Sequence, residues 1–390
     1  MSLSRRMFMR GLAAFGASST LLSRALAQSG TTGKALVTIF LRGGVDGLSM
    51  VPALGDPQLQ SLRPTLFVKG LPLNGFFGLH PAMSALLPLY HSKKLAVLHA
   101  TGQASASRSH FEAQDFLESG DAGKKHDGFL NRAALAMGPQ GDSAFRVVAL
   151  QNALPRSLSG EAGAVAFPSL KDFRVAGGGA NANTFESLYD QAVDDALRTS
   201  GQDAFAGMDL IHDKGLGDAP SRNGASYPRS VLGKRLQDIA RLIHGEVGLR
   251  IAATETGGFD THLAQGADEG QLATRLKDLG DSLAAFATDL GTKLDDVVVL
   301  TVTEFGRTAR ENGTRGTDHG TASAMFAMGG GVRGGRVIAD WPGLAQTRLF
   351  ENRDLAMTTD VRCVLVEALS AASLPSNVFP DFTARRVELF

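Results

Sequence analysis

The chain has 390 residues, of which 43% are hydrophobic and 20% are charged. This composition supports one large domain or two modest ones with a buried core, and it excludes a disordered or fibrous protein. The 39 basic residues balance the 39 acidic ones. Nucleic-acid binding is typical of chains with a basic excess, so we expect no nucleic-acid partner. The single cysteine, Cys363, excludes an intrachain disulfide and a cysteine-cluster metal site.

Residues 1–27 have the pattern of a signal peptide. Arg5 and Arg6 come before Phe8, an apolar run covers residues 11–22, and small residues follow at 25–27. The apolar run is shorter than the roughly 20 residues that cross a bilayer, which disfavours a membrane-spanning helix. The paired arginines resemble a twin-arginine signal. We therefore predict export by the twin-arginine machinery to the periplasm or the medium, with no stable membrane anchor.

Short apolar runs alternate with helical patterns along the rest of the chain, which predicts an α/β fold. The expected strands are residues 36–41, 95–99, 146–150, 249–253 and 297–302. The expected helices are residues 82–91, 111–118, 184–198, 231–243 and 272–290. We predict a doubly wound, mostly parallel sheet with helices on both faces. This domain would span residues 34–390, with a helical insertion or cap at about residues 155–245.

Ligands of open α/β sheets gather at the carboxyl ends of the strands. Polar side chains follow four of the predicted strands in this chain, and they include acids, histidines, a hydroxyl and arginines. They are Asp46 after the first strand, Arg108, Ser109 and His110 after the second, Asp260 and His262 after the fourth, and Glu304, Arg307, Asp318 and His319 after the fifth. We therefore expect the site at this edge of the sheet.

Two short motifs suggest a metal site. Asp260 and His262 are two residues apart, and on an extended segment this spacing puts both side chains on one face. Asp318 and His319 form a similar pair between glycines. Each motif also fits a turn with a capping acid and a surface histidine. Carboxylates together with imidazoles favour Zn²⁺, Mn²⁺ or Mg²⁺.

Other candidates have a structural alternative as well. Ser109 could cap a helix, with Glu112 completing a capping box, or its hydroxyl could face the site. Asp46 could stabilise its turn or bind metal. Arg108 and Arg307 could each clamp an anionic oxygen or serve in a structural ion pair.

Motifs along nearly the whole chain after the signal resemble an exported family, the domain-of-unknown-function family 1501. The motifs that carry the resemblance are Arg42-Gly43-Gly44-x-Asp46-Gly47, Leu62-Arg63-Pro64, Gly78-Leu79-His80-Pro81, Arg108-Ser109-His110-Phe111, Phe259-Asp260-Thr261-His262, Glu304-Phe305-Gly306-Arg307 and Gly316-Thr317-Asp318-His319-Gly320.

That family is similar in strand order and motif placement to the alkaline phosphatase and sulfatase superfamily, whose members hold one or two metals at the strand ends. The resemblance implies that Asp46 is the first metal-binding acid and that Ser109 is the nucleophile. It also implies that Asp260 and His262 form the loop pair of ligands. His319, with Asp318 beside it, matches the last histidine of the superfamily.

The chain departs from the superfamily where Glu304-Phe305 replaces an Asp-His pair. Glu304 is then the candidate metal ligand at that place, and one imidazole ligand is missing from the pattern. The resemblance implies a metal-dependent hydrolase of a small or polymeric phosphate or sulfate ester. In that reaction the metal or His110 would activate Ser109, and Arg108 or Arg307 would balance the developing charge. The missing imidazole favours an alternative, a non-catalytic exported scaffold or binding protein that retains the fold.

Overall fold

The computed structural model describes residues 33–105, 107–121, 126–138, 143–173 and 205–390. The predicted signal peptide and the predicted helix at residues 184–198 lie outside these residues, and so does part of the predicted cap. Among the described residues no helix combines the length and the apolar character needed to cross a membrane.

A nine-stranded sheet runs through the domain in the order β10-β4-β9-β8-β1-β7-β5-β6, with β11 paired to β4. The strands are β1 (Ala35–Leu41), β4 (Leu95–Gly102), β5 (Val147–Leu150), β6 (Val165–Phe167), β7 (Ile251–Thr256), β8 (Val297–Val302), β9 (Ser323–Gly329), β10 (Val337–Ile338) and β11 (Thr359–Asp360). A separate antiparallel pair joins β2 (Leu71–Pro72) to β3 (Gly78–Leu79). The five strands predicted from the sequence are all present.

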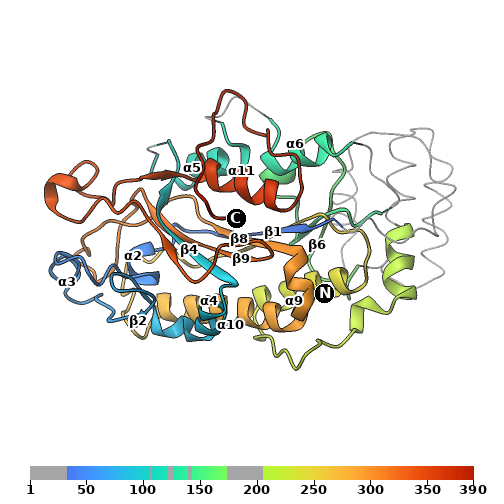
Figure 1. The fold of residues 1–390 in the computed structure, drawn as a ribbon, viewed down its shortest axis with the longest axis horizontal. Helices are drawn as coiled ribbons and strands as arrows, with labels where there is room; N and C mark the ends of the chain where they lie inside the picture. The colour runs from blue at the N-terminus through green and yellow to red at the C-terminus, as the bar shows by residue number, and fades with distance from the viewer. Residues whose placement is uncertain (1–32, 106, 122–125, 139–142, 174–204) are drawn as a thin grey trace.

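Helices cover both faces of this sheet (Figure 1). One face carries α4 (Leu87–His91), α9 (Val231–His244) and α10 (Gln271–Leu290), and the other carries α5 (His110–Ser119), α6 (Phe129–Ala136) and α11 (Val361–Ala371). Alternate residues of β1 point to opposite faces, so Val37 and Ile39 join the α9–α10 core while Leu36 and Phe40 join the other. The doubly wound α/β fold is confirmed.

Two of the differences from the sequence prediction bear on the site and its surroundings. The helix expected at residues 82–91 is a 3₁₀ segment, Pro81–Leu86, followed by the short α4. Pro88 in the first turn of α4 explains the break, because proline has no N–H to continue a helix through that point. Strand β9 was not predicted, and it runs antiparallel to both β4 and β8. The segment before β9 therefore lies at the same edge as the carboxyl ends of β4 and β8.

His99 is a buried titratable group in the middle of the fold. Its Nδ1 accepts a hydrogen bond from the Ala100 N–H at 2.7 Å, and its Nε2 lies 3.0 Å from the carbonyl oxygen of Val51. The ring stacks on Phe77 with a centroid distance of 5.3 Å. Burial lowers the pKa of His99 from 6.5 to about 4. The folded protein therefore keeps this imidazole neutral.

We expect His99 to make the fold sensitive to acid. Below pH 6.5 the unfolded chain protonates this histidine while the folded chain resists until about pH 4, so stability falls through that window. At about pH 4 the free energy of unfolding is lower by roughly 2 to 3 kcal/mol than above pH 6.5. Urea unfolding of His99→Gln should decline less steeply over this range than that of the parent. The exposed control His91→Gln should follow the parent, and equal slopes for all three proteins would refute the assignment.

Candidate metal centre

Three strand-end segments meet at one edge of the sheet. The chain leaving β4 reaches His110, the first residue of α5, and the chain leaving β7 carries Asp260 and His262. His319 lies just before β9 and forms an isolated antiparallel bridge with Arg307, which follows β8. Residues from distant parts of the sequence are thus placed side by side, as the sequence predicted for Asp260, His262 and His319.

The nitrogen and oxygen atoms of these side chains converge. Single ligand atoms of His110, Asp260 and His319 all lie within 4.8 Å of one another, so these residues could hold a metal ion. The Nε2 atoms of His262 and His319 are 2.9 Å apart and lie 3.0 and 3.1 Å from Asp260 Oδ1. The Nε2 of His110 is 3.4 Å from Asp260 Oδ2. Asp260 thus contacts all three imidazoles.

Each of the three rings is oriented through its other nitrogen. The Nδ1 of His110 lies 2.8 Å from Glu304 Oε1, that of His262 lies 3.0 Å from Asp318 Oδ1, and that of His319 lies 2.8 Å from the carbonyl oxygen of Arg108. Carbonyl and carboxylate oxygens only accept hydrogen bonds, so each Nδ1 carries the proton in this arrangement. Each neutral ring then presents an Nε2 lone pair, the form in which histidine binds metals.

This convergence fits a cation. Two nitrogen lone pairs 2.9 Å apart repel each other unless a proton or a metal ion lies near both. Nitrogen ligands of one tetrahedral zinc are about 3.3 Å apart, given Zn–N distances of roughly 2.0 Å. The His110 Nε2 is buried and lacks a hydrogen-bond partner among the described residues. The cluster nevertheless faces solvent, because the side chains of Asp260 and His262 are 42% and 44% exposed.

Two acids from the predicted ligand set lie behind the histidines. Glu304 is buried, and its Oε1 accepts hydrogen bonds from His110 Nδ1, the Gly43 N–H at 2.8 Å and Gln114 Nε2 at 2.9 Å. Asp318 accepts from His262 Nδ1 and from Asn312 Nδ2 at 3.1 Å. In these positions both carboxylates orient imidazoles, the usual task of acids around a metal site.

His110 contributes a third imidazole beside Asp260. The resemblance implies that His110 activates Ser109, but in the structure its Nε2 lies 3.4 Å from Asp260 Oδ2. No local sequence signal pointed to this role, because His110 is placed by its contact with Glu304. That pairing joins residues 194 positions apart, and it is invisible to local spacing.

Arg307 holds Asp260 in place. Its guanidinium is buried, and Nη1 donates to Asp260 Oδ1 at 2.7 Å while Nε donates to Thr317 Oγ1 at 3.1 Å. Burial raises the pKa of Asp260, but the hydrogen bond and charge of Arg307 outweigh it, so the pKa lies below its ordinary value. Burial also lowers the pKa of His319. Both groups are therefore kept in the forms that bind a cation.

Asp46 is fully buried below the cluster. It caps the short helix α2 (Gly47–Met50) and pairs with Arg63 at 2.6 Å. Gln265 donates to the same oxygen at 2.7 Å. Burial raises the pKa of Asp46, but the ion pair with Arg63 and these hydrogen bonds lower it by more. The pKa therefore lies below its ordinary value. Asp46 is not in the group formed by His110, Asp260 and His319.

A buried hydrogen-bond chain links Asp46 to the cluster. Gln265 donates to Asp46 and accepts from Thr317 Oγ1 at 2.8 Å. Thr317 in turn accepts from Arg307, which holds Asp260. A fully satisfied chain of this kind stiffens what it supports. We assign Asp46 to the foundation of the site and not to its ligands.

Arg108 and Ser109 directly precede α5 in the chain. The Arg108 guanidinium pairs with Glu351 and Asp354, both at 2.6 Å, while its carbonyl oxygen orients His319. Ser109 occupies the N-cap position of α5, but its side chain makes no capping hydrogen bond. Glu112 accepts a hydrogen bond from Ser107 at 2.5 Å in place of the predicted capping box with Ser109. The Ser109 side chain is exposed beside His110.

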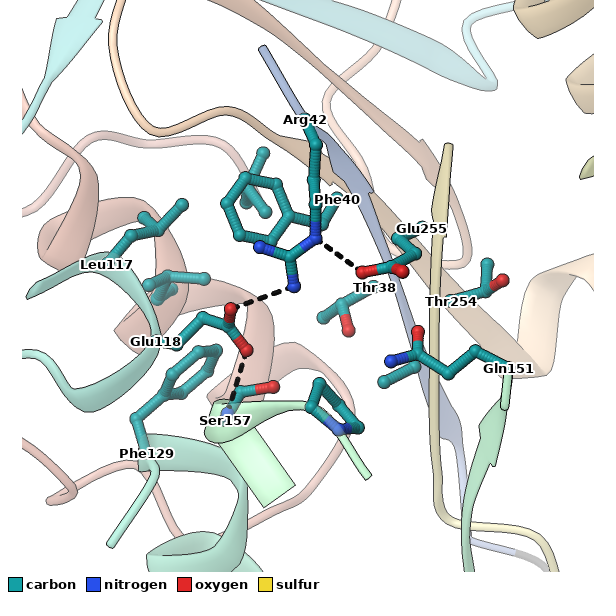
Figure 2. Close-up of a pocket in the computed structure, with 14 residues that line it drawn as sticks. Thr38, Phe40, Arg42, Leu117, Glu118, Phe129, Gln151, Ser157, Thr254 and Glu255 are labelled. Atoms are coloured by element: carbon teal, nitrogen blue, oxygen red, sulfur yellow. Dashed lines mark hydrogen bonds and ion pairs between the residues drawn. The ribbon is translucent and has the colours of Figure 1, made fainter. Parts of the chain in front are cut away.

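A polar network leads from the cluster to a small cavity. Gln114, which donates to Glu304, accepts from Arg42 Nη1 at 3.0 Å. Figure 2 shows Arg42 between Glu118 and Glu255 on the wall of this cavity. Its volume of about 20 Å³ suits roughly one water molecule. This cavity is therefore too small for an organic ligand.

Gly43 makes the close packing of the site possible. Its φ of +115° lies in the region that side chains rarely adopt, and a Cβ there would come within 2.7 Å of the Asp260 backbone nitrogen. The freed backbone N–H donates to Glu304. One glycine thus permits contact between the loops that carry Asp260 and Glu304.

We expect the histidine cluster to bind one divalent ion. His319→Ala and His110→Ala should each lower the metal content of purified, zinc-loaded protein to well below one equivalent, since each removes one ligand. The exposed control His91→Ala should retain the parent's content. Metal analysis after desalting measures this, and thermal unfolding checks that each variant is folded. Folded variants with a full equivalent of zinc would refute the site.

Asp46→Asn tests the structural assignment of Asp46. The substitution leaves Arg63 buried without its counter-charge, which typically costs about 3 to 5 kcal/mol. We therefore expect a large fall in the free energy of unfolding, with zinc retained by the protein that remains folded. Urea unfolding and metal analysis measure the two effects. Normal stability together with lost zinc would instead make Asp46 a ligand.

Comparison with solved structures finds similarities at low sequence identity. The C-terminal periplasmic domain of EcEptC from Escherichia coli, solved in complex with Zn, matches with 9% identity over 92% of this chain and 89% of its own, at a TM-score of 0.43. The PsFucS1 sulfatase from Pseudoalteromonas sp. matches with 11% identity over 92% of this chain and 72% of its own, at 0.35.

A third similar structure is the phosphonate monoester hydrolase of Agrobacterium radiobacter, with 12% identity over 88% of this chain and 74% of its own, at a TM-score of 0.36. These similarities concern broad architecture alone. No curated protein matches the chain. The family model described as Protein of unknown function (DUF1501) matches residues 33–370. The chain therefore belongs to this family.

Proposed function

We propose that the protein is a metal-dependent hydrolase of an anionic ester, with a phosphate or sulfate group. The observation that carries the proposal is the convergence of three imidazole Nε2 atoms and the Asp260 carboxylate at a solvent-facing edge. Three protein nitrogens with an accessible position are typical of catalytic metal sites. Zn²⁺ suits this set best, because imidazoles favour it over Mg²⁺.

The chain's own residues would divide the work. A bound cation would polarise the ester oxygens and lower the pKa of a neighbouring hydroxyl. His110, His262 and His319 would hold that cation, with their tautomers fixed by Glu304, Asp318 and the Arg108 carbonyl. Arg307 would keep Asp260 ionised and in position. Both guanidinium groups named as charge stabilisers are already paired with carboxylates, which favours positioning roles for them.

Ser109 is the nucleophile that we propose. Its hydroxyl is exposed, is not used to cap α5, and adjoins His110 in the chain. In the reaction Ser109 Oγ would attack phosphorus or sulfur, the alcohol would leave with the proton that the serine loses, and water would then cleave the seryl ester. The start of α5 carries a partial positive charge that favours an anionic group there.

A non-catalytic scaffold is the alternative, and the third imidazole that His110 places beside Asp260 supports the hydrolase over it. Export by the twin-arginine route and the partnership with that machinery stay part of the proposal. They rest on Arg5, Arg6 and the apolar run after them.

We expect zinc-loaded protein to hydrolyse at least one of p-nitrophenyl phosphate, bis-p-nitrophenyl phosphate and p-nitrophenyl sulfate. Chelation should abolish the activity and zinc should restore it. Ser109→Ala should lower kcat by about two or more orders of magnitude, as losing a nucleophile does. The exposed control Ser92→Ala should keep the parent's rate. Fully metallated protein that is inactive on all three substrates would favour the scaffold.

A further inference from the structure

Two exposed apolar residues directly follow histidines of the proposed metal centre in the chain. Five large hydrophobic side chains among the described residues are exposed, namely Phe111 at 89%, Val231 at 64%, Leu263 at 63%, Leu135 at 50% and Phe350 at 37%. Phe111 directly follows His110, and Leu263 directly follows His262. The most exposed aromatic ring and an exposed leucine thus each adjoin a proposed metal ligand.

The two side chains leave the backbone close to the same centre. Neighbouring Cα atoms are about 3.8 Å apart, so Phe111 and Leu263 start one residue from His110 and His262. The rings of those histidines both pack on His319, with centroid distances of 4.4 and 4.7 Å. Phe111 approaches from α5 and Leu263 from the loop after β7.

A series of hydrogen bonds connects the Phe350 backbone to His319. The backbone N–H of Phe350 donates to the Asp354 carbonyl oxygen at 2.9 Å, and the Asp354 carboxylate holds Arg108. The Arg108 carbonyl in turn orients His319. Exposed apolar residues thus occur in three separate segments, each joined to the cluster by chain adjacency or by hydrogen bonds.

A solvated phenylalanine contributes nothing to the core, and apolar surface around an open polar site is typical of ligand-binding clefts. We propose that Phe111 and Leu263 bind the organic group of the substrate, which would be an anionic ester carrying a hydrocarbon chain or an aromatic ring. This inference rests on the proposed hydrolase function. The metal centre would bind the anionic group of the ester. The side chains of Phe111 and Leu263, called the apolar rim below, would bind its organic group.

Binding of two phosphonates, which hydrolysis cannot consume, tests the rim separately from turnover. Calorimetry on the zinc-loaded full chain should show hexylphosphonate binding at least about tenfold more tightly than methylphosphonate, because the longer tail buries more apolar surface. The double variant Phe111→Ser with Leu263→Ser should remove most of that preference and leave the methylphosphonate Kd unchanged. The matched control, Val231→Ser with Leu135→Ser, should keep the preference.

Equal affinities for the two phosphonates would overturn the inference, and so would an equal loss in the control variant. Binding to phosphatidylglycerol vesicles that depends on Phe111 and Leu263, without any hexylphosphonate preference, would make the rim a membrane contact and also overturn it. If the protein prefers hexylphosphonate but hydrolyses no ester, the binding role of Phe111 and Leu263 is supported. Only the proposed hydrolase function is then contradicted.

Discussion

The site depends on an electrostatic constraint. The imidazoles of His110, His262 and His319 each lie within 3.4 Å of the Asp260 carboxylate, and the Nε2 atoms of His262 and His319 are only 2.9 Å apart. Lone pairs and a negative charge brought this close are stable only around positive charge. Glu304, Asp318 and the Arg108 carbonyl take up the other nitrogen of each ring, so the rings have little freedom to turn away.

The fold provides the rigidity that this crowding requires. Asp260 receives a buried guanidinium from Arg307, and a hydrogen-bond chain continues through Thr317 and Gln265 to the ion pair of Asp46 and Arg63. The links from Arg307 to Arg63 are buried, so breaking any of them leaves an unpaired polar group in an apolar environment. The base of the site is therefore stiff, while its upper side, with Asp260 and His262, is open to solvent.

The sequence predicts much of this arrangement. Apolar runs and helical periodicity placed the central strands, and the rule that ligands lie at strand ends brought Asp260, His262 and His319 to one edge. The assignment of roles was harder, because which acid binds a metal and which one orients a histidine depends on distances of about one side chain. His110 and Glu304 meet across 194 residues, and Asp46 faces Arg63 inside the core. Neither contact can be predicted from the spacing of residues within a short motif.

X-ray absorption spectroscopy of zinc-loaded parent protein tests the central claim most directly, because it reads the ligands of the metal itself. We expect a four- or five-coordinate zinc with multiple-scattering features from three imidazoles and a nearest shell at about 2.0 Å. A zinc surrounded by oxygen atoms alone, with no imidazole scattering, would contradict it.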